Sequence, residues 1–236
     1  MVDIHYFRSG KQNQRKIALT FDDGPTPGIT EKVAETLESF GVRGTFFVIG
    51  RWVAEAASRA TIQRLLDGGH IVGNHSNYHF HPNSVMSYPP NEFNDAEGII
   101  SEVCGQPTQY ARAPYVCYRR AVCASLKNWL EIETKRKIID VDVWGFDWDM
   151  SLTSQDIINN ILANPRTLEG VPHPLDSGAI VCLHDGSEQQ DRFTRPTRML
   201  NALPAIIHGL QTRDFELVSV DELALRDEEA IAFHCT

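Results

Sequence analysis

The stretch Leu19-Thr20-Phe21-Asp22-Asp23-Gly24-Pro25 is the part of the chain on which the fold prediction depends. It continues a short apolar run that starts at Lys16, so two neighbouring carboxylates come at the end of a predicted strand, where Gly24 and Pro25 turn the chain. Two acids side by side in a buried turn repel each other unless they share a cation, an arginine or a proton. The four residues Asp22-Asp23-Gly24-Pro25 are also typical of an ordinary surface turn. Residues further along the chain are needed to distinguish a functional site from such a turn.

Helical and strand-like patterns alternate through the rest of the chain. Apolar residues recur at helical spacing over residues 28–40, Gly41 marks the expected helix end, and residues 45–49 have the composition of a buried strand. This alternation is typical of parallel βα units, so we predict an α/β barrel of about seven parallel strands. Further helices are expected over residues 52–67, 91–104, 121–130, 154–162 and 197–210, and further strands over residues 70–73, 109–111, 137–143, 179–183 and 215–220.

The length, composition and charge of the chain exclude several classes of protein. With 236 residues, 42% of them hydrophobic and 22% charged, the chain can bury a large core, and since no linker or repeat divides it we expect one domain over residues 1–236. The net charge of −9, with no basic stripe, argues against nucleic acid or an anionic membrane as a partner. No apolar run approaches the roughly 18 residues of a membrane span, and residues 1–16 contain no apolar signal region.

Two histidines follow the strand predicted over residues 70–73. His75 and His79 are four residues apart, and on a helical turn this spacing would place both imidazoles on one face, within reach of one cation. With a carboxylate from Asp22 or Asp23 they would form a two-His, one-Asp metal site with open positions, which is typical of catalysis. The chain has nine histidines, so ordinary loop histidines are the competing interpretation, and His81 is expected to be one of these.

Three further polar groups follow predicted strands. Arg112, just past residues 109–111, could hold a carboxylate through two hydrogen bonds, and Pro114 would stiffen the turn so that the next backbone N–H faces a substrate. Asp147-Trp148 follows the strand over residues 137–143, and Leu183-His184-Asp185 ends the strand over residues 179–183. Because the C-terminal ends of parallel strands meet at one edge of a barrel, these residues are the expected active-site residues.

Taken together and in this order, the motifs resemble the five-motif signature of the polysaccharide deacetylases. This family is also known as the NodB-homology or chitin deacetylase-like family, or carbohydrate esterase family four. The resemblance covers roughly residues 16–220, and its first two motifs are highly specific. The motifs are Thr20-Phe21-Asp22-Asp23-Gly24-Pro25, His75-Ser76-x-x-His79, Arg112-x-Pro114-Tyr115, Asp147-Trp148 and Leu183-His184-Asp185.

The resemblance implies a distorted (β/α) barrel and a role for each motif residue. It implies one divalent metal ion, usually Zn²⁺, held by Asp23, His75 and His79. Asp22 would be the general base, oriented by Arg112, and His184 the general acid, its imidazole oriented by Asp147. The backbone N–H of Tyr115 would help to stabilise the oxyanion, and Trp148 and Leu183 would form the walls of the acetyl pocket.

Two features depart from the family pattern. Val116 stands where many relatives have glycine, and no acidic residue comes two or three positions before Asp147. Both departures are expected to change the shape of the substrate site rather than the reaction. Among five cysteines, Cys117 and Cys123 are close enough for a small disulfide loop, but reduced thiols fit the sequence equally well.

The resemblance implies a hydrolase that removes N-acetyl groups from N-acetylglucosamine units of chitin, chito-oligosaccharide or peptidoglycan, outside the cell or at its envelope. An esterase that removes O-acetyl groups from xylan or a related glycan could use the same groups. A non-catalytic glycan-binding relative would be expected to lose metal ligands or the base, and all are present in this sequence. A phosphoesterase is disfavoured by the acidic charge, and the sequence indicates no oligomeric state.

Overall fold

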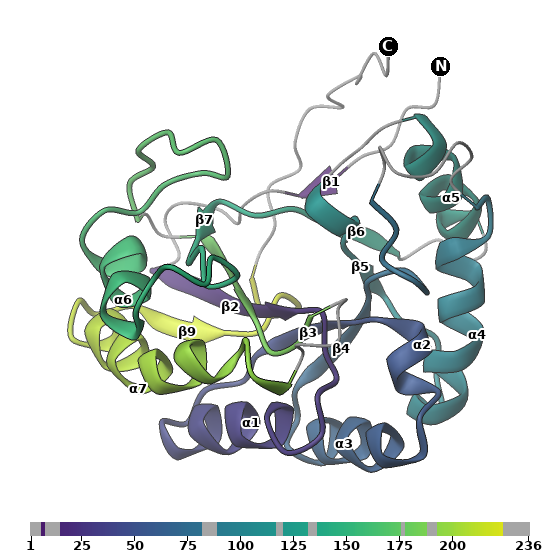
Figure 1. Ribbon diagram of the computed structural model, residues 1–236, viewed down its shortest axis with the longest axis horizontal. Coiled ribbons are helices and arrows are strands. Elements are labelled where there is room, and N and C mark those ends of the chain that lie inside the picture. Colours follow the sequence, from purple (N-terminus) through teal and green to yellow (C-terminus); the bar gives the residue numbers. More distant parts are fainter. Residues whose placement is uncertain are drawn as a thin grey trace.

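The computed structural model describes residues 6–7, 15–81, 89–116, 120–131, 136–175, 178–187 and 193–223. Within these residues all nine strands belong to one parallel sheet, and the helices lie around its outside (Figure 1). The strands are β1 (Tyr6–Phe7), β2 (Lys16–Asp22), β3 (Thr45–Val48), β4 (Ile71–Asn74), β5 (Tyr110–Ala111), β6 (Lys137–Ile139), β7 (Val143–Trp144), β8 (Ile180–His184) and β9 (Glu216–Val218).

The helices cover the outer side of the sheet and follow the predicted alternation. The helix expected over residues 52–67 is two helices, because the chain breaks at Ala54 and Glu55. The helices are α1 (Thr30–Ser39), α2 (Gly50–Val53), α3 (Ala56–Asp67), α4 (Glu92–Cys104), α5 (Arg120–Leu130), α6 (Ser154–Leu162) and α7 (Thr197–Gln211), with a short 3-10 turn, η2 (Pro114–Val116).

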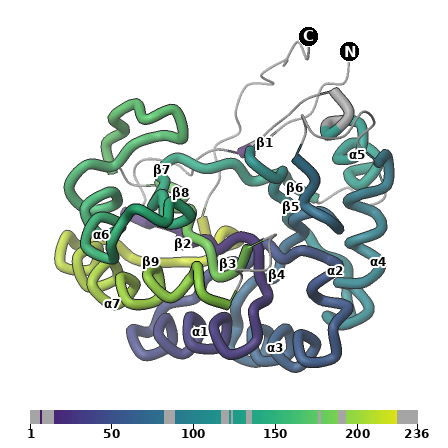
Figure 2. The backbone as a smooth tube through the Cα atoms, viewed as in Figure 1, coloured from purple at the N-terminus to yellow at the C-terminus, as the bar shows by residue number. Residues whose placement is uncertain are grey.

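The sheet curls into a barrel-like shape. Its strand order is β1-β6-β5-β4-β3-β2-β8-β7, with β9 paired to the start of β2. Although β6 lies near one margin and β7 forms the other, only residues 140–142 separate them, a reach of at most about 15 Å. The two margins therefore have to approach each other, as the path of the backbone shows (Figure 2). The prediction of a barrel-like α/β fold with a parallel sheet is confirmed, and the sheet has nine strands, two of them only two residues long at its margins, where about seven were expected.

The expectation of one strand over residues 137–143 was wrong. The N–H of Asp140 donates to the carbonyl of Phe7 in β1 (2.8 Å), and the N–H of Asp142 donates to the carbonyl of Ile180 in β8 (3.0 Å). This short segment therefore joins the two margins of the sheet instead of continuing β6. The alternation of Asp140 and Asp142 with Val141 and Val143 is also typical of a continuing strand, so the sequence contains no sign of the break. The break is imposed by contacts between distant segments.

Strand β2 is buried on both faces, which explains its continuous apolar run. Ile17, Leu19 and Phe21 belong to the core between sheet and helices. The alternate residues face the inside of the curled sheet, where Ala18 packs with residues of β3, β6 and β8. The same alternation turns Asp22 inward at the end of the strand.

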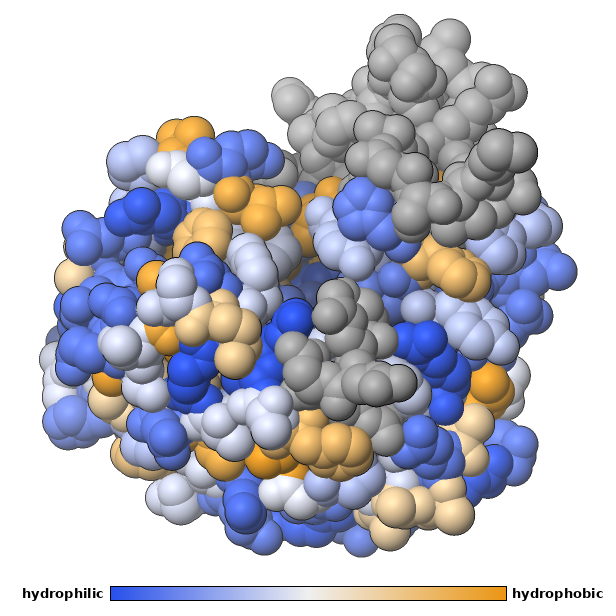
Figure 3. All heavy atoms as spheres, in the orientation of Figure 1, coloured by the Kyte–Doolittle hydropathy of each residue, from blue (hydrophilic) through white to orange (hydrophobic). Residues whose placement is uncertain are grey.

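Hydrophilic residues cover most of the face seen in Figure 3, and hydrophobic residues are scattered among them. Among the described residues no helix combines the length and the apolar character that crossing a membrane requires.

A buried ionic network supports the outer side of the sheet. Glu97 of α4 accepts hydrogen bonds from the indole N–H of Trp129 (2.8 Å) and the backbone N–H of Thr108 (2.8 Å), and it pairs with Arg136 (3.1 Å). All of these side chains are buried. Because Asn74 donates to the carbonyl of Phe93 in the same helix, this network also supports the end of β4.

We expect Glu97→Gln to lower the free energy of unfolding by about 3 kcal/mol, because it leaves Arg136 buried without its counter-ion. The matched control is Glu102→Gln, which breaks an exposed pair with Arg59 and should cost less than about 1 kcal/mol. Urea unfolding followed by circular dichroism measures both values. Equal losses for the two variants would show that the network does not support the fold as described.

Candidate active site

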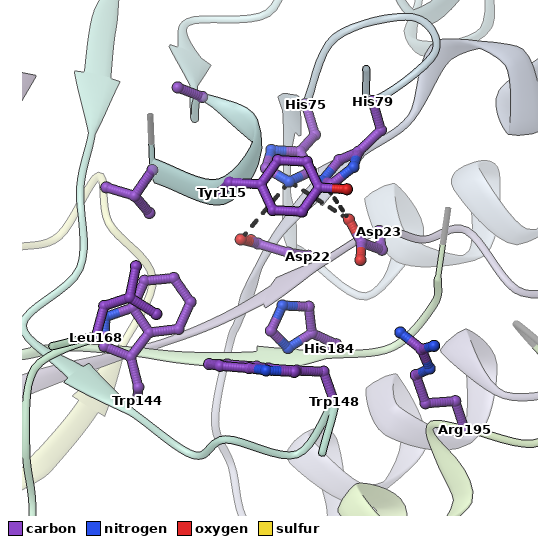
Figure 4. Close-up of a pocket in the computed structure, with 12 residues that line it drawn as sticks. Asp22, Asp23, His75, His79, Tyr115, Trp144, Trp148, Leu168, His184 and Arg195 are labelled. Carbon is purple, nitrogen blue, oxygen red and sulfur yellow. Dashed lines mark ion pairs between the residues drawn. The ribbon is translucent and has the colours of Figure 1, made fainter. Parts of the chain in front are cut away.

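The predicted catalytic residues meet at one edge of the sheet. Asp22 ends β2, His184 ends β8, His75 and Arg112 directly follow β4 and β5, and Asp147 follows β7. All of them are carried by C-terminal ends of parallel strands, as predicted. A pocket of about 210 Å³ opens there (Figure 4), lined by Asp22, Asp23, His75, His79, Ala113, Tyr115, Val116, Trp144, Trp148, Leu168, His184 and Arg195.

Arg112 forms the predicted ion pair with Asp22 inside the curled sheet. Its Nη1 lies 2.7 Å from Asp22 Oδ1 and also donates to the hydroxyl of Thr20 (2.8 Å). Its other N–H groups donate to the carbonyls of Ile139 (3.1 Å) and Asp140 (3.2 Å). Burial works against the charge, but the Asp22 carboxylate, together with other nearby groups that include Asp140, raises the pKa of the guanidinium above its usual range. The charge of Asp22 is thus balanced by a permanent cation.

Asp23, His75 and His79 form a compact set of metal-ligand atoms. Asp23 Oδ1 lies 3.4 Å from His75 Nε2 and 3.1 Å from His79 Nε2, and all three ligand atoms lie within 4.8 Å of one another. In a tetrahedral zinc site, ligand atoms about 2.1 Å from the ion lie about 3.4 Å apart. Asp23 Oδ1 is buried and accepts no well-aligned hydrogen bond, so a cation would supply its missing partner. These residues therefore fit a divalent metal ion.

The loop that carries the two histidines is not a helical turn, so that part of the prediction was wrong. Ser76 and His79 have left-handed backbone conformations (φ 65° and 56°), and it is these turns that bring His79 back beside His75. The hydroxyl of Ser76 accepts from the N–H of His79 (3.1 Å), and Glu92 accepts from the N–H groups of Asn77 and Tyr78. The loop is thus held by buried side chains rather than by helical hydrogen bonds.

His75 is oriented by its second ring nitrogen. Nδ1 lies 2.9 Å from the carbonyl oxygen of Arg112, and because a carbonyl can only accept, Nδ1 carries the proton. In the neutral imidazole Nε2 is then the unprotonated nitrogen, and it is directed at Asp23, which is the arrangement required of a metal ligand. Burial would raise the pKa of Asp23, but the neighbouring His79 helps to hold it well below its usual range. A carboxylate that stays ionised is again suited to a cation.

His184 and Asp147 also pair as predicted. His184 Nδ1 lies 2.9 Å from Asp147 Oδ1, and the backbone N–H of His184 donates to Asp147 Oδ2 (2.8 Å). Burial alone would lower the pKa of His184, but the carboxylates of Asp147, Asp23 and Asp22 together raise it to about 9. The imidazole is therefore protonated at neutral pH and can donate a proton.

Aromatic side chains form the walls beside His184. The ring of Trp148 lies edge-on to His184 (5.3 Å between centroids) and to Trp144 (5.3 Å). Tyr115 lies over the metal-ligand side, 4.8 Å from His79, and its backbone φ of 56° is left-handed. Trp148 and Tyr115 thus lie where they were predicted, at the pocket.

Leu183 does not line the pocket, which corrects its prediction as a wall of the acetyl site. Side chains alternate along a strand, so Leu183 faces away from His184 and is fully buried in the core between sheet and helices. Trp144, at the end of β7, lines the pocket instead.

Four further side chains line the pocket that were not predicted from the sequence: Ala113, Trp144, Leu168 and Arg195. Ala113 lies inside the Arg112-x-Pro114-Tyr115 motif, and Trp144 lies three residues before Asp147, so inspection of these motifs and their neighbours could have found both. Leu168 and Arg195 come from connecting segments, in which no sequence pattern indicates a pocket residue. Val116 was noted as a departure, and it too lines the pocket with a left-handed φ of 47°.

The cysteines add no structural cross-link within the described residues. Cys104 and Cys182 carry free thiols. Cys117 and the side chain of Cys123 lie outside the described part of the chain, so the suggested disulfide loop stays a prediction.

Comparison with known proteins supports the same assignment. A family model described as polysaccharide deacetylase matches residues 9–130. A chitooligosaccharide deacetylase of Azorhizobium caulinodans is 31% identical over 221 residues, covering 87% of this chain and 93% of that protein. A bifunctional xylanase/deacetylase of Pseudobutyrivibrio xylanivorans is 29% identical over 213 residues, covering 90% of this chain but only 31% of that protein.

A crystal structure of the Bc1960 peptidoglycan N-acetylglucosamine deacetylase shares the fold. Its TM-score is 0.73 at 26% identity, with 92% of each chain covered. With its five motifs gathered around one pocket and these relatives along most of its length, the chain belongs to the polysaccharide deacetylase family, carbohydrate esterase family four.

Proposed function

We propose that this protein is a divalent-metal-dependent hydrolase that removes N-acetyl groups from N-acetylglucosamine units of chito-oligosaccharides or peptidoglycan. One observation carries the proposal. A carboxylate paired with Arg112 and an imidazole paired with Asp147 face the same pocket as the Asp23, His75 and His79 set. Amide hydrolysis requires a base, an acid and positive charge near the carbonyl, and this arrangement supplies all three.

The residues of the chain divide the proton transfers between them. Asp22 takes a proton from the attacking water as the new carbon–oxygen bond forms, while Arg112 holds the carboxylate in position. When the carbon–nitrogen bond breaks, protonated His184 gives its proton to the leaving nitrogen, and acetate and a free amine result. A bound divalent ion at Asp23, His75 and His79 would supply the positive charge that polarises the acetyl carbonyl.

The pocket walls suit a small acyl group. Trp144 and Trp148 provide apolar surface on the side of His184, where an acetyl methyl group can be excluded from water. Tyr115 lines the pocket beside His79, and its backbone N–H is the donor that we assign to the oxyanion.

A second candidate is an O-acetyl esterase acting on xylan or a related glycan, which the similarity to a xylanase/deacetylase favours. The same base and acid would serve, since an alkoxide leaving group also needs a proton. Acetate release from chitopentaose and from acetylated xylan separates the two activities. A non-catalytic glycan-binding role is disfavoured because the base, the acid and all three metal ligands are present in one pocket.

The metal assignment predicts that His79→Ala weakens zinc binding by more than the roughly 10–100-fold typical for loss of an outer-shell partner. His81→Ala is the matched control, because His81 packs against Tyr115 and is not part of the ligand set. Isothermal titration with zinc measures both affinities. Equal zinc affinity in the two variants would rule out His79 as a ligand.

The base assignment predicts that Asp22→Asn lowers acetate release from chitopentaose by about 10²–10⁴-fold, because an amide cannot accept the proton. Zinc content should be retained, since Asp22 is not in the Asp23, His75 and His79 set. The control Asp67→Asn makes the same chemical change on an exposed residue of α3 and should leave the rate unchanged. Undiminished release by Asp22→Asn would refute the assignment.

The acid assignment predicts a pH effect. His184 must be protonated to act, so activity should fall as pH rises through its pKa, which Asp147 helps to raise to about 9. Without the Asp147 carboxylate, burial lowers this pKa with less opposition, so Asp147→Asn should move the basic limb of the kcat/KM profile to lower pH. A bound cation shifts the pH profiles of the unmodified protein and of Asp147→Asn in the same direction. The test is therefore the difference between the basic limbs of these two profiles. An unmoved limb would contradict the pairing.

A further inference from the structure

A second group of metal-binding atoms lies beside the proposed metal site. Asp22, Cys182 and His184 each present one ligand atom, and these atoms lie within 4.8 Å of one another. The thiol of Cys182 donates to Asp22 Oδ2 at 3.4 Å. The parallel register of β2 and β8 produces the cluster, because Asp22 pairs with His184 and Thr20 pairs with Cys182.

Cys182 has no role in the proposed mechanism. Strand alternation places Cys182 on the same face of β8 as His184, opposite Leu183. The thiol is fully buried and packs with Val141 and Trp144, at the pocket side of the sheet. A thiolate, an imidazole and a carboxylate together are a donor set that thiophilic divalent ions such as Zn²⁺ and Cd²⁺ prefer.

We propose that Asp22, Cys182 and His184 form a second, weaker site for a thiophilic divalent ion, and that filling it inhibits the enzyme. The inhibition follows because the ion would occupy the carboxylate that accepts a proton and the imidazole that donates one. This consequence rests on the proposed function, whereas the binding of the ion does not.

The second site has to be weaker than the first for three reasons. Binding releases two protons: the divalent ion, the Cys182 thiol and the His184 imidazolium give a thiolate–imidazole complex and two H⁺. Arg112 already lies 2.7 Å from the other oxygen of Asp22 and repels a cation. An ion at Asp23, His75 and His79 would repel a second one nearby. The site should therefore fill only when metal is in excess.

Cadmium tests the site directly, because a cadmium–thiolate bond has its own ultraviolet charge-transfer band. After metal removal, we expect the full chain to bind a second equivalent of Cd²⁺ with this band, and Cys182→Ala to lose both the second equivalent and its share of the band. Cys182→Ser, which keeps the size of the side chain, should behave as Cys182→Ala does. Cys104→Ala is the matched control and should retain the second equivalent, because Cys104 lies outside the cluster.

His79→Ala separates the two sites. It should lose the tighter cadmium and keep the thiolate band, since His79 belongs to the first ligand set only. Retention of the second equivalent and of the full band in Cys182→Ala and Cys182→Ser would overturn the proposal.

Excess zinc tests the consequence for activity. Acetate release by the unmodified chain should fall as free Zn²⁺ rises beyond saturation of the first site, and Cys182→Ala should need at least about tenfold more zinc for the same inhibition. Identical inhibition curves would overturn the inhibitory role. If no acetate is released at any zinc concentration, the proposed function fails, while the cadmium stoichiometry still decides whether the second site exists.

Discussion

The buried ion pair between Arg112 and Asp22 is the interaction on which the site depends. An arginine inside a protein is costly unless its charge and its N–H groups are satisfied. Here one guanidinium meets the carboxylate of Asp22, the hydroxyl of Thr20 and the carbonyls of Ile139 and Asp140. These partners come from β2, from β6 and from the segment that joins the two margins of the sheet. The same side chain therefore holds the curled sheet together and positions the proposed base.

Two adjacent carboxylates are given different roles by their surroundings. Asp22 ends β2 in extended backbone and faces Arg112, whereas Asp23 has a left-handed φ of 71°, which turns its side chain toward His75 and His79. The turn at Asp23 packs closely against the residues that follow β8. A Cβ on Gly186 would lie only 2.1 Å from the carbonyl oxygen of Asp23. Left-handed non-glycine residues cluster around the pocket, as is common at functional sites.

Much of this arrangement could be predicted from the sequence, because the motifs follow buried strands and parallel strands end at one edge. What could not be predicted depends on tertiary contacts. The break after Ile139 arises because the chain has to join the two margins of the sheet. Leu183 faces the core between sheet and helices, and this direction depends on where the strand begins and how it is paired. His79 approaches His75 because Ser76 and His79 have left-handed backbone conformations, not because of helical spacing. Arg195 reaches the pocket from a connecting segment that carries no motif.

The central claim is that Asp23, His75 and His79 coordinate a single divalent ion next to the carboxylate of Asp22. The most direct measurement is anomalous diffraction from crystals of the purified protein, recorded on both sides of the zinc absorption edge. The account predicts one strong anomalous peak within about 2.0–2.2 Å of Asp23 Oδ and of both Nε2 atoms. Peaks only at other positions, or no peak in crystals of protein that contains zinc, would contradict it.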